Sequence, residues 1–170
     1  MLLALAEAGA QAFAPLALLA LLKHPLVAAG DDRLAWLEGA RALDLALRGP
    51  RPAAGLAGIE AHLADAEGYD AHVRRAALGW WREVAPMLRP LEALYAGGAA
   101  PLTALLAQLR ETAAALCGDD LWSRVEGRAA AALLDDLERE ARHGPALDEP
   151  ESLTAMLRTL MDEVAVRPPQ

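Results

Sequence analysis

The sequence predicts an all-α protein with about seven helices in one compact, irregular bundle. Apolar residues make up 55% of the chain and aromatic residues only 4%, so the core must consist mainly of Leu, Ala and Val, a mixture that favours helix. Proline and glycine divide the chain into segments with apolar residues at helical spacing, and no long stretch alternates with a period of two. The length of 170 residues predicts one domain covering residues 1–170.

The first half of the chain predicts four helices. The first covers residues 2–13, and the second begins at Pro15, a residue suited to a first helical position, and ends at His24 because Pro25 disfavours helical geometry in the residue before it. Asp31 or Asp32 then caps a helix that runs to residue 47. A loop rich in proline and glycine follows at residues 48–55, before a weaker helix at residues 56–67.

The second half predicts the remaining helices. An amphipathic helix starts at Tyr69, with Val73, Ala76, Trp80 and Val84 as its apolar stripe; Pro86 interrupts it and Pro90 restarts it as far as residue 97. Further helices are expected at residues 101–118, at 119–143 with Asp119 as the cap and Gly144 as the left-handed terminal residue, and at 150–164.

Charge and cysteine content restrict the classes of function. The formal net charge of −8 argues against a protein that mainly wraps nucleic acid, although residues 23–51 carry five basic and four acidic side chains. The single cysteine, Cys117, fits a reducing compartment, and the apolar start of the chain has neither the basic region of a signal peptide nor the length of a membrane span. We therefore expect a cytoplasmic protein without a membrane partner. One Lys, one Ile and no Asn indicate a GC-rich, bacterial genome.

No residue pattern indicates catalysis or a cofactor. His62 and His72 lie ten residues apart and lack the spacing of a metal site, so they are interpreted as surface residues. Asp135, Asp136 and Glu140 form an acidic run similar to a magnesium-binding motif, but neighbouring arginines favour a solvated helix face. The chain has no nucleophile elbow and no P-loop. We expect no catalytic residue, no metal and no cofactor in this chain.

Six cations are candidates for contact with DNA or with a neighbouring domain: Lys23, Arg48, Arg51, Arg75, Arg82 and Arg89. Arg48 and Arg51 flank a rigid loop, and Arg75, Arg82 and Arg89 recur every seven residues beside Trp80 and Trp81, which suits contact with phosphates and stacking on bases. The opposing interpretation is that Pro86 breaks this register and that the tryptophans belong to the core. Lys23 and His24 are equally well explained as the last turn of a helix, where cations are favourable.

Three segments resemble consecutive parts of AddB, a subunit of the bacterial AddAB helicase–nucleases that repair DNA double-strand breaks. They are "PLALLALLKHPL" (residues 15–26), "ARALDLALRGPRPAAGLAGI" (40–59) and "SLTAMLRTLMDEVAVRP" (152–168). The element "LLKHPL" is also similar to segments of UvrD and RecB-type helicases. The resemblance extends over nearly the whole chain but over only a small part of an AddB subunit.

The resemblance implies a helical subdomain of the helicase-like half of the subunit, of the kind called 2B in related helicases, excised from a longer chain. Such a module is noncatalytic and contributes to subunit packing or to the DNA path. Its expected partners are the rest of the AddB-like subunit and an AddA-like subunit, and direct contact of this chain with DNA is expected to be weak. The family's nuclease motif and iron–sulfur cysteines lie elsewhere in the subunit. An independent helical adaptor that binds a partner helix through its apolar stripes stays as the alternative.

Overall fold

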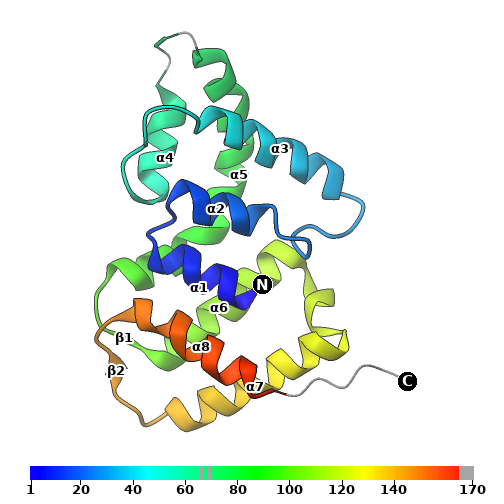
Figure 1. Ribbon diagram of the computed structural model, residues 1–170, viewed down its shortest axis with the longest axis vertical. Coiled ribbons are helices and arrows are strands. Elements are labelled where there is room, and N and C mark those ends of the chain that lie inside the picture. Colours follow the sequence, from blue (N-terminus) through cyan, green and yellow to red (C-terminus); the bar gives the residue numbers. More distant parts are fainter. Residues whose placement is uncertain (66, 69, 165–170) are drawn as a thin grey trace.

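The computed structural model describes residues 1–65, 67, 68 and 70–164 (Figure 1). In this part of the chain there are eight α-helices: α1 (Leu2–Ala10), α2 (Pro15–Leu22), α3 (Arg33–Ala46), α4 (Gly55–Ala64), α5 (Ala71–Ala96), α6 (Leu102–Cys117), α7 (Val125–Ala141) and α8 (Leu153–Asp162). Short 3-10 helices, η1 (Asp119–Trp122) and η2 (Pro150–Ser152), precede α7 and α8. The strands β1 (Ala100–Pro101) and β2 (Ala146–Leu147) pair antiparallel. The predicted all-α fold is confirmed.

Helix α5 connects the two ends of the molecule. It packs against α3 and α4 in the upper part of Figure 1, and against α6 and α1 below. Helix α1 also packs against α2, α6 and α8, so it lies at the centre of the lower part. The buried side chains form a hydrophobic core of mostly leucine and alanine, with Trp81 as its largest fully buried member.

The predicted break at Pro86 is wrong, because α5 continues through both Pro86 and Pro90. Each proline lacks the N–H that would donate to the carbonyl four residues earlier, a local cost of about 3 kcal/mol in a helix interior. Both prolines lie on the exposed face. The opposite face carries a continuous row of buried side chains, and its packing against neighbouring helices keeps the helix intact. That row comprises Ala77, Trp81, Val84, Ala85, Leu88, Leu91 and Tyr95.

The buried face of α5 is also rotated from the predicted stripe. Ala76 is exposed and Trp80 is half-buried, whereas Ala77 and Trp81 are buried. Tyr69, the predicted first residue of the stripe, lies outside the described residues. A period of 3.6 fits two adjacent stripes on so apolar a helix, so packing decides which of them faces the core.

The predicted helix from Asp119 to His143 is two elements. Gly118, with φ of 74°, is at the N-cap of η1, and Ser123 closes that helix by donating from its backbone N–H and its hydroxyl to the carbonyl of Asp120. Arg124 is then extended and α7 begins at Val125. Gly144 is not left-handed, because α7 already ends at Ala141.

The first turn of the chain is tighter than predicted. Helix α1 ends at Ala10 rather than near Phe13, because Ala12 and Phe13 adopt positive φ values of 48° and 52°. The Phe13 N–H donates to the carbonyl of Ala8, which closes the helix and turns the chain toward α2. Phe13 is thereby placed in the core, with 1% of its surface exposed.

Candidate DNA and partner surfaces

Lys23 follows the last residue of α2 and forms an ion pair with the next long helix. Its Nζ lies 2.5 Å from Oδ2 of Asp44 in α3, and Nε of Arg48 lies 3.7 Å from Oδ1 of the same carboxylate. The hydrogen bond from Lys23 is the largest cause that lowers the pKa of Asp44, ahead of the charges of Lys23 and Arg48. Two of the six candidate cations therefore share one internal counter-ion.

The end of α2 is capped by Arg33, which the sequence patterns did not single out. Its guanidinium donates to the carbonyl oxygens of Lys23 (3.1 Å), His24 (3.1 Å) and Val27 (2.6 Å). The interpretation of Lys23 and His24 as residues at a helix end is correct in position. The cation on the free carbonyls, however, comes from the start of α3. No spacing rule predicts such a contact, because it depends on the turn between two helices.

Arg82 and Arg89 converge on one carboxylate of α4. Because α5 is unbroken, residues seven apart lie nearly on one face of it. Nε of Arg82 lies 3.7 Å from Oε1 of Glu60, and Nη2 of Arg89 lies 3.0 Å from its Oε2. Arg75, on the same helix, is exposed. The shared face exists because the expected break at Pro86 is absent, and its consequence is an interhelical ion-pair cluster.

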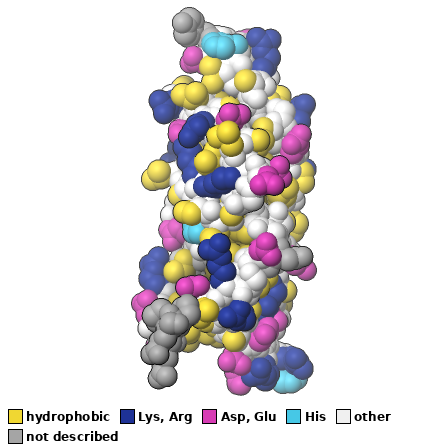
Figure 2. Space-filling view, turned by 90° about the vertical axis from the view of Figure 1, so that its right-hand side faces the viewer, with side chains coloured by type: hydrophobic (Ala, Val, Ile, Leu, Met, Phe, Trp, Pro, Cys, Tyr) yellow, Lys and Arg dark blue, Asp and Glu magenta, His cyan; other side chains and the backbone are white. Residues whose placement is uncertain are grey.

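The two remaining candidates, Arg51 and Arg75, have no ion-pair partner among the described residues, and both are exposed. Arg51 lies in the loop between α3 and α4, and Arg75 lies in the first turns of α5. In Figure 2, basic and acidic side chains are interspersed over the face shown, without one continuous basic band. A strong phosphate-binding groove would require such a band.

The tryptophans beside the arginines are unavailable for stacking on bases. Trp81 is completely buried. Trp80 packs against Trp36 of α3 in an edge-to-face arrangement, with ring centroids 5.1 Å apart and planes at 73°. Trp36 in turn donates its Nε1–H to the carbonyl of Leu22, at 2.8 Å. These aromatic rings join α2, α3 and α5, so the core interpretation holds for both positions.

Asp135 and Asp136 of α7 form ion pairs with different arginines. Oδ1 of Asp135 lies 2.7 Å from Nη2 of Arg110, and Oδ1 of Asp136 lies 2.8 Å from Nη1 of Arg139. Nη2 of Arg110 also lies 3.4 Å from Oε1 of Glu138, and its Cζ lies 5.8 Å from the ring centroid of Trp122. Arg110 therefore links α6 to α7 and η1. Among the described residues, no three His, Cys, Asp or Glu side chains lie together in a way that could hold a metal ion.

The histidines have separate environments. One ring nitrogen, Nε2 of His62, lies 3.0 Å from the carbonyl oxygen of Ala46, which joins α4 to the end of α3. His72 is exposed near the start of α5. The structure therefore does not bring these two side chains into a shared site.

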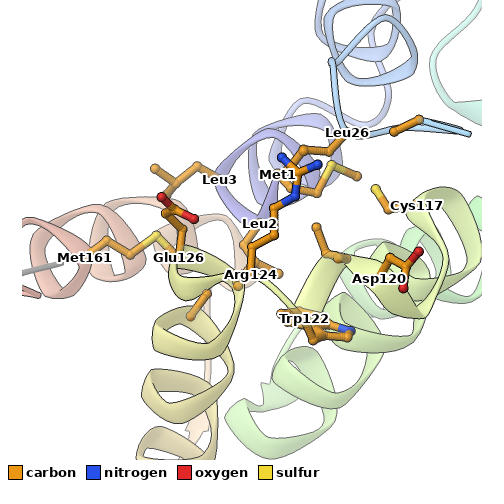
Figure 3. A pocket seen from close by; sticks show the side chains of 14 residues that line it. Met1, Leu2, Leu3, Leu26, Cys117, Asp120, Trp122, Arg124, Glu126 and Met161 are labelled. Carbon is orange, nitrogen blue, oxygen red and sulfur yellow. The ribbon is translucent and has the colours of Figure 1, made fainter. Parts of the chain in front are cut away.

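An open groove of about 480 Å³ lies between α1 and the η1–α7 segment, and we call it the α1–α7 groove. Its walls are mostly apolar, and Figure 3 shows Glu126 and Met161 toward its left side and Asp120 and Cys117 toward its right. The main lining residues are Leu2, Leu3, Leu26, Leu121, Trp122 and Ala130. Burial raises the pKa of the Cys117 thiol to about 11, so this thiol is protonated at neutral pH and is a poor nucleophile.

The remaining findings concern membrane-spanning helices and similarity to known proteins. Among the described helices, none combines the length and the apolar character needed to cross a membrane. No protein-family model matches the chain, and neither a curated protein nor a solved structure is similar enough to count as a match.

Proposed function

We propose that this chain is a noncatalytic helical module of an AddB-like subunit in a helicase–nuclease that repairs DNA double-strand breaks. In this proposal it packs against the rest of that subunit or against an AddA-like subunit, in the cytoplasm, and it holds no cofactor. The 2B-type comparison belongs to the same proposal. Its basis is the order of the resembling segments together with three exposed leucines, two of which lie in those segments.

The exposure of three leucines is the single observation that supports a packing role best. The three large hydrophobic side chains with the greatest exposure in the described residues are Leu16 (83%), Leu34 (65%) and Leu45 (52%). Leu16 is in α2 and the other two are in α3, where a spacing of eleven residues places them on the same face. Leu16 and Leu45 belong to the segments that resemble AddB. In this proposal a neighbouring domain or subunit covers these leucines.

The internal ion pairs make DNA a secondary partner in this proposal. Lys23, Arg48, Arg82 and Arg89 each have an acidic neighbour, which leaves Arg51 and Arg75 as the candidates for phosphate contact. Two cations would give weak binding with a modest dependence on salt, because the salt dependence grows with the number of phosphate contacts.

The reading frame that encodes the chain provides the first test. Helicase-like sequence on both sides is expected, whereas a natural start codon at Met1 and a stop codon after Gln170 would contradict the proposal. The purified chain should also show neither ATPase nor nuclease activity. Turnover that persists through stringent purification and disappears in an active-site variant of this chain would also overturn the noncatalytic assignment.

The packing role is tested in the complete subunit by Leu16→Glu combined with Leu45→Glu. We expect this double variant to weaken assembly with the AddA-like partner or to loosen the subunit, as measured by size-exclusion chromatography and limited proteolysis. The control is Ala35→Glu, which introduces the same side chain at an exposed position of α3. Unchanged assembly and proteolysis in the double variant would exclude this surface.

DNA contact is tested by titrating labelled single-stranded and double-stranded DNA at two salt concentrations. Arg51→Ala combined with Arg75→Ala should remove the salt-dependent binding of the chain, while Arg41→Ala, at another exposed position, should leave it unchanged. Equal losses in both variants would show that only net charge matters.

The α1–α7 groove favours the alternative function, an adaptor that receives the apolar face of a partner helix. Ala130 lines this groove, whereas Ala132 is exposed and does not. For an adaptor, Ala130→Arg should abolish binding of a synthetic amphipathic helix with a leucine face, and Ala132→Arg should retain it. Equal binding by both variants would remove the adaptor hypothesis.

A further inference from the structure

Helix α5 lacks two backbone hydrogen bonds near its middle. Pro86 has no N–H to donate to the carbonyl of Arg82, and Pro90 has none to donate to the carbonyl of Pro86. Sharp bends in helices occur mainly at such positions. Before the prolines, α5 meets α3 at Trp80, and after them it meets α1 at Tyr95. A change of bend at the prolines would therefore move α3 relative to α1.

Glu60 of α4 contacts α5 on both sides of Pro86. Nε of Arg82, before this proline, lies 3.7 Å from Oε1 of Glu60, and Nη2 of Arg89, after it, lies 3.0 Å from Oε2. The side chains of both arginines are more than half exposed, so each ion pair alone is weak and is sensitive to salt. Together they join the two sides of the proline through one carboxylate.

Glu92, which follows both prolines, caps the start of α4. The N-cap residue of α4 is Ala54, whose side chain has no hydrogen-bond acceptor. Oε1 of Glu92 instead accepts a hydrogen bond from the backbone N–H of Leu56, at 2.7 Å. Glycine at position 55 permits this approach, because a Cβ there would lie 2.7 Å from the same oxygen. The start of α4 is thus attached to the part of α5 that follows Pro90.

The other end of α4 is attached to the start of α5. Oδ2 of Asp65, the C-cap residue of α4, lies 3.9 Å from Nη1 of Arg74. Between its two ends, α4 buries Leu56, Ile59 and Leu63 and packs against α5. Helix α4 therefore runs antiparallel along α5 and makes polar contacts with it before, between and after the two prolines.

We propose that α5 has a hinge at Pro86 and Pro90 and that α4 is the brace that holds this hinge in one position. Loss of the contacts of Glu60 and Glu92 lets α5 change its bend at the prolines. That motion changes the orientation of α3, with its exposed leucines, relative to the α1–α7 groove. The inference is independent of the proposed repair function, because it uses only the contacts between α4 and α5.

The test measures a distance along α5 in the complete chain by pulsed electron paramagnetic resonance. Spin labels are attached at Ala76→Cys and Ala96→Cys, exposed positions on opposite sides of the prolines, after Cys117→Ala removes the native thiol. We expect one narrow distance distribution in this background. Adding Glu60→Ala and Glu92→Ala should broaden the distribution about twofold or add a second resolved distance. An unchanged distribution would overturn the proposal.

Replacement of the prolines tests whether the motion is located at them. Pro86→Ala and Pro90→Ala, added to the chain that lacks both glutamates, should restore the narrow distribution, because each alanine returns an N–H donor to the helix. Broadening that persists without the prolines would assign the effect to a general loosening of the fold and would overturn the hinge.

The matched control for the loss of a carboxylate is Asp135→Ala, which removes an ion pair between α7 and Arg110 and should keep the narrow distribution. Glu60→Ala alone retains the Glu92 cap on α4 and should broaden the distribution to a smaller degree, so it serves if the double variant does not fold. Thermal denaturation of each variant shows whether it folds. Equal distributions in Glu60→Ala and Asp135→Ala would contradict the role of α4 as a brace.

Discussion

At the scale of single residues, Arg33 has the clearest structural role. One guanidinium satisfies three backbone carbonyls after the end of α2, and it does so from the first residue of α3. Hydrogen bonds from charged groups are stronger than neutral ones, and the planar fork of arginine can serve several acceptors at once. The turn between α2 and α3 therefore depends on the shape of this side chain as well as on its charge.

We expect Arg33→Lys to destabilise the protein by about 1–3 kcal/mol, because an ammonium group cannot reach all three carbonyls. Urea denaturation followed by circular dichroism measures the free energy of unfolding. Arg41→Lys, at an exposed position of the same helix, is the matched control and should change it little. Equal stability of the two variants would show that charge alone is sufficient at Arg33.

His24 makes the stability of the same turn dependent on pH. Its Nδ1 accepts a hydrogen bond from the backbone N–H of Leu26, at 3.2 Å. The pKa of His24 is lowered first by burial, then by the positive charges of the chain's N-terminus and of Arg33. The unfolded state therefore binds a proton more readily than the folded state. The contribution of this pKa difference to the free energy of unfolding is complete above the ordinary histidine pKa of about 6.5. It is lost as the pH falls from there through the lower pKa of the folded state.

We expect the urea concentration at the unfolding midpoint to decrease between pH 7.5 and pH 5.5. In His24→Gln this decrease should be smaller than in the wild-type chain. Glutamine retains a side-chain acceptor but does not titrate in this range. His143→Gln, at an exposed position after α7, should keep the wild-type decrease. A decrease of the same size in the wild type and in His24→Gln would assign the effect to other groups.

At the scale of elements, α5 shows how packing overrides a local helix breaker. The two prolines remove two backbone hydrogen bonds, but they lie on the solvent side of a helix with a buried opposite face. The helix persists because its stability comes from the buried side chains more than from each backbone hydrogen bond.

We therefore expect Pro86→Ala to stabilise the protein by about 1–3 kcal/mol, since it restores a donor to the carbonyl of Arg82 and relieves the clash of the ring. Gly79→Ala, with no atom within 4 Å of the added methyl group, should give a smaller gain of about 0.5–1 kcal/mol. Chemical denaturation of both variants gives the comparison. Destabilisation by Pro86→Ala would mean that the structure requires a bend at this position.

At the scale of the whole molecule, α1 holds the lower helices together. It contacts α2, α5, α6 and α8, and it approaches α5 so closely that Gly9 lies against the ring of Tyr95. A similar close approach occurs in the upper part, where a Cβ at Gly39 would lie 2.4 Å from Cε2 of Trp80. Glycine at these two crossings sets the distance between helices.

Replacing Gly9 tests this arrangement. Gly9→Ala should destabilise the protein by about 1–3 kcal/mol despite the better helix propensity of alanine, because the methyl group has no space beside the aromatic ring. The matched control is again Gly79→Ala, which adds the same methyl group where there is room. Thermal unfolding should shift in opposite directions for the two variants, and a shift in the same direction would contradict the close packing of α1 on α5.

The all-α class of the fold follows from the sequence alone. Its aliphatic composition, its helical spacing and its turn residues predict the helices, most of them within a few residues of their observed ends. Those signals are local, since they arise from backbone preference and from the period of one helix. The sequence also showed the seven-residue spacing of Arg82 and Arg89, and a core role for the tryptophans was one of its two interpretations. These predictions succeeded because they require no knowledge of neighbouring helices.

Three features depend on contacts between helices: which stripe of α5 is buried, the continuity of α5 through Pro86, and the acidic neighbours of four of the six candidate cations. The contact of Arg33 with the carbonyls at the end of α2 was likewise visible only in the folded structure. Each of these features joins residues that are distant in the sequence or belong to different helices. Their energies come from packing and from pairing of charges across helices, which the spacing within a single helix does not encode.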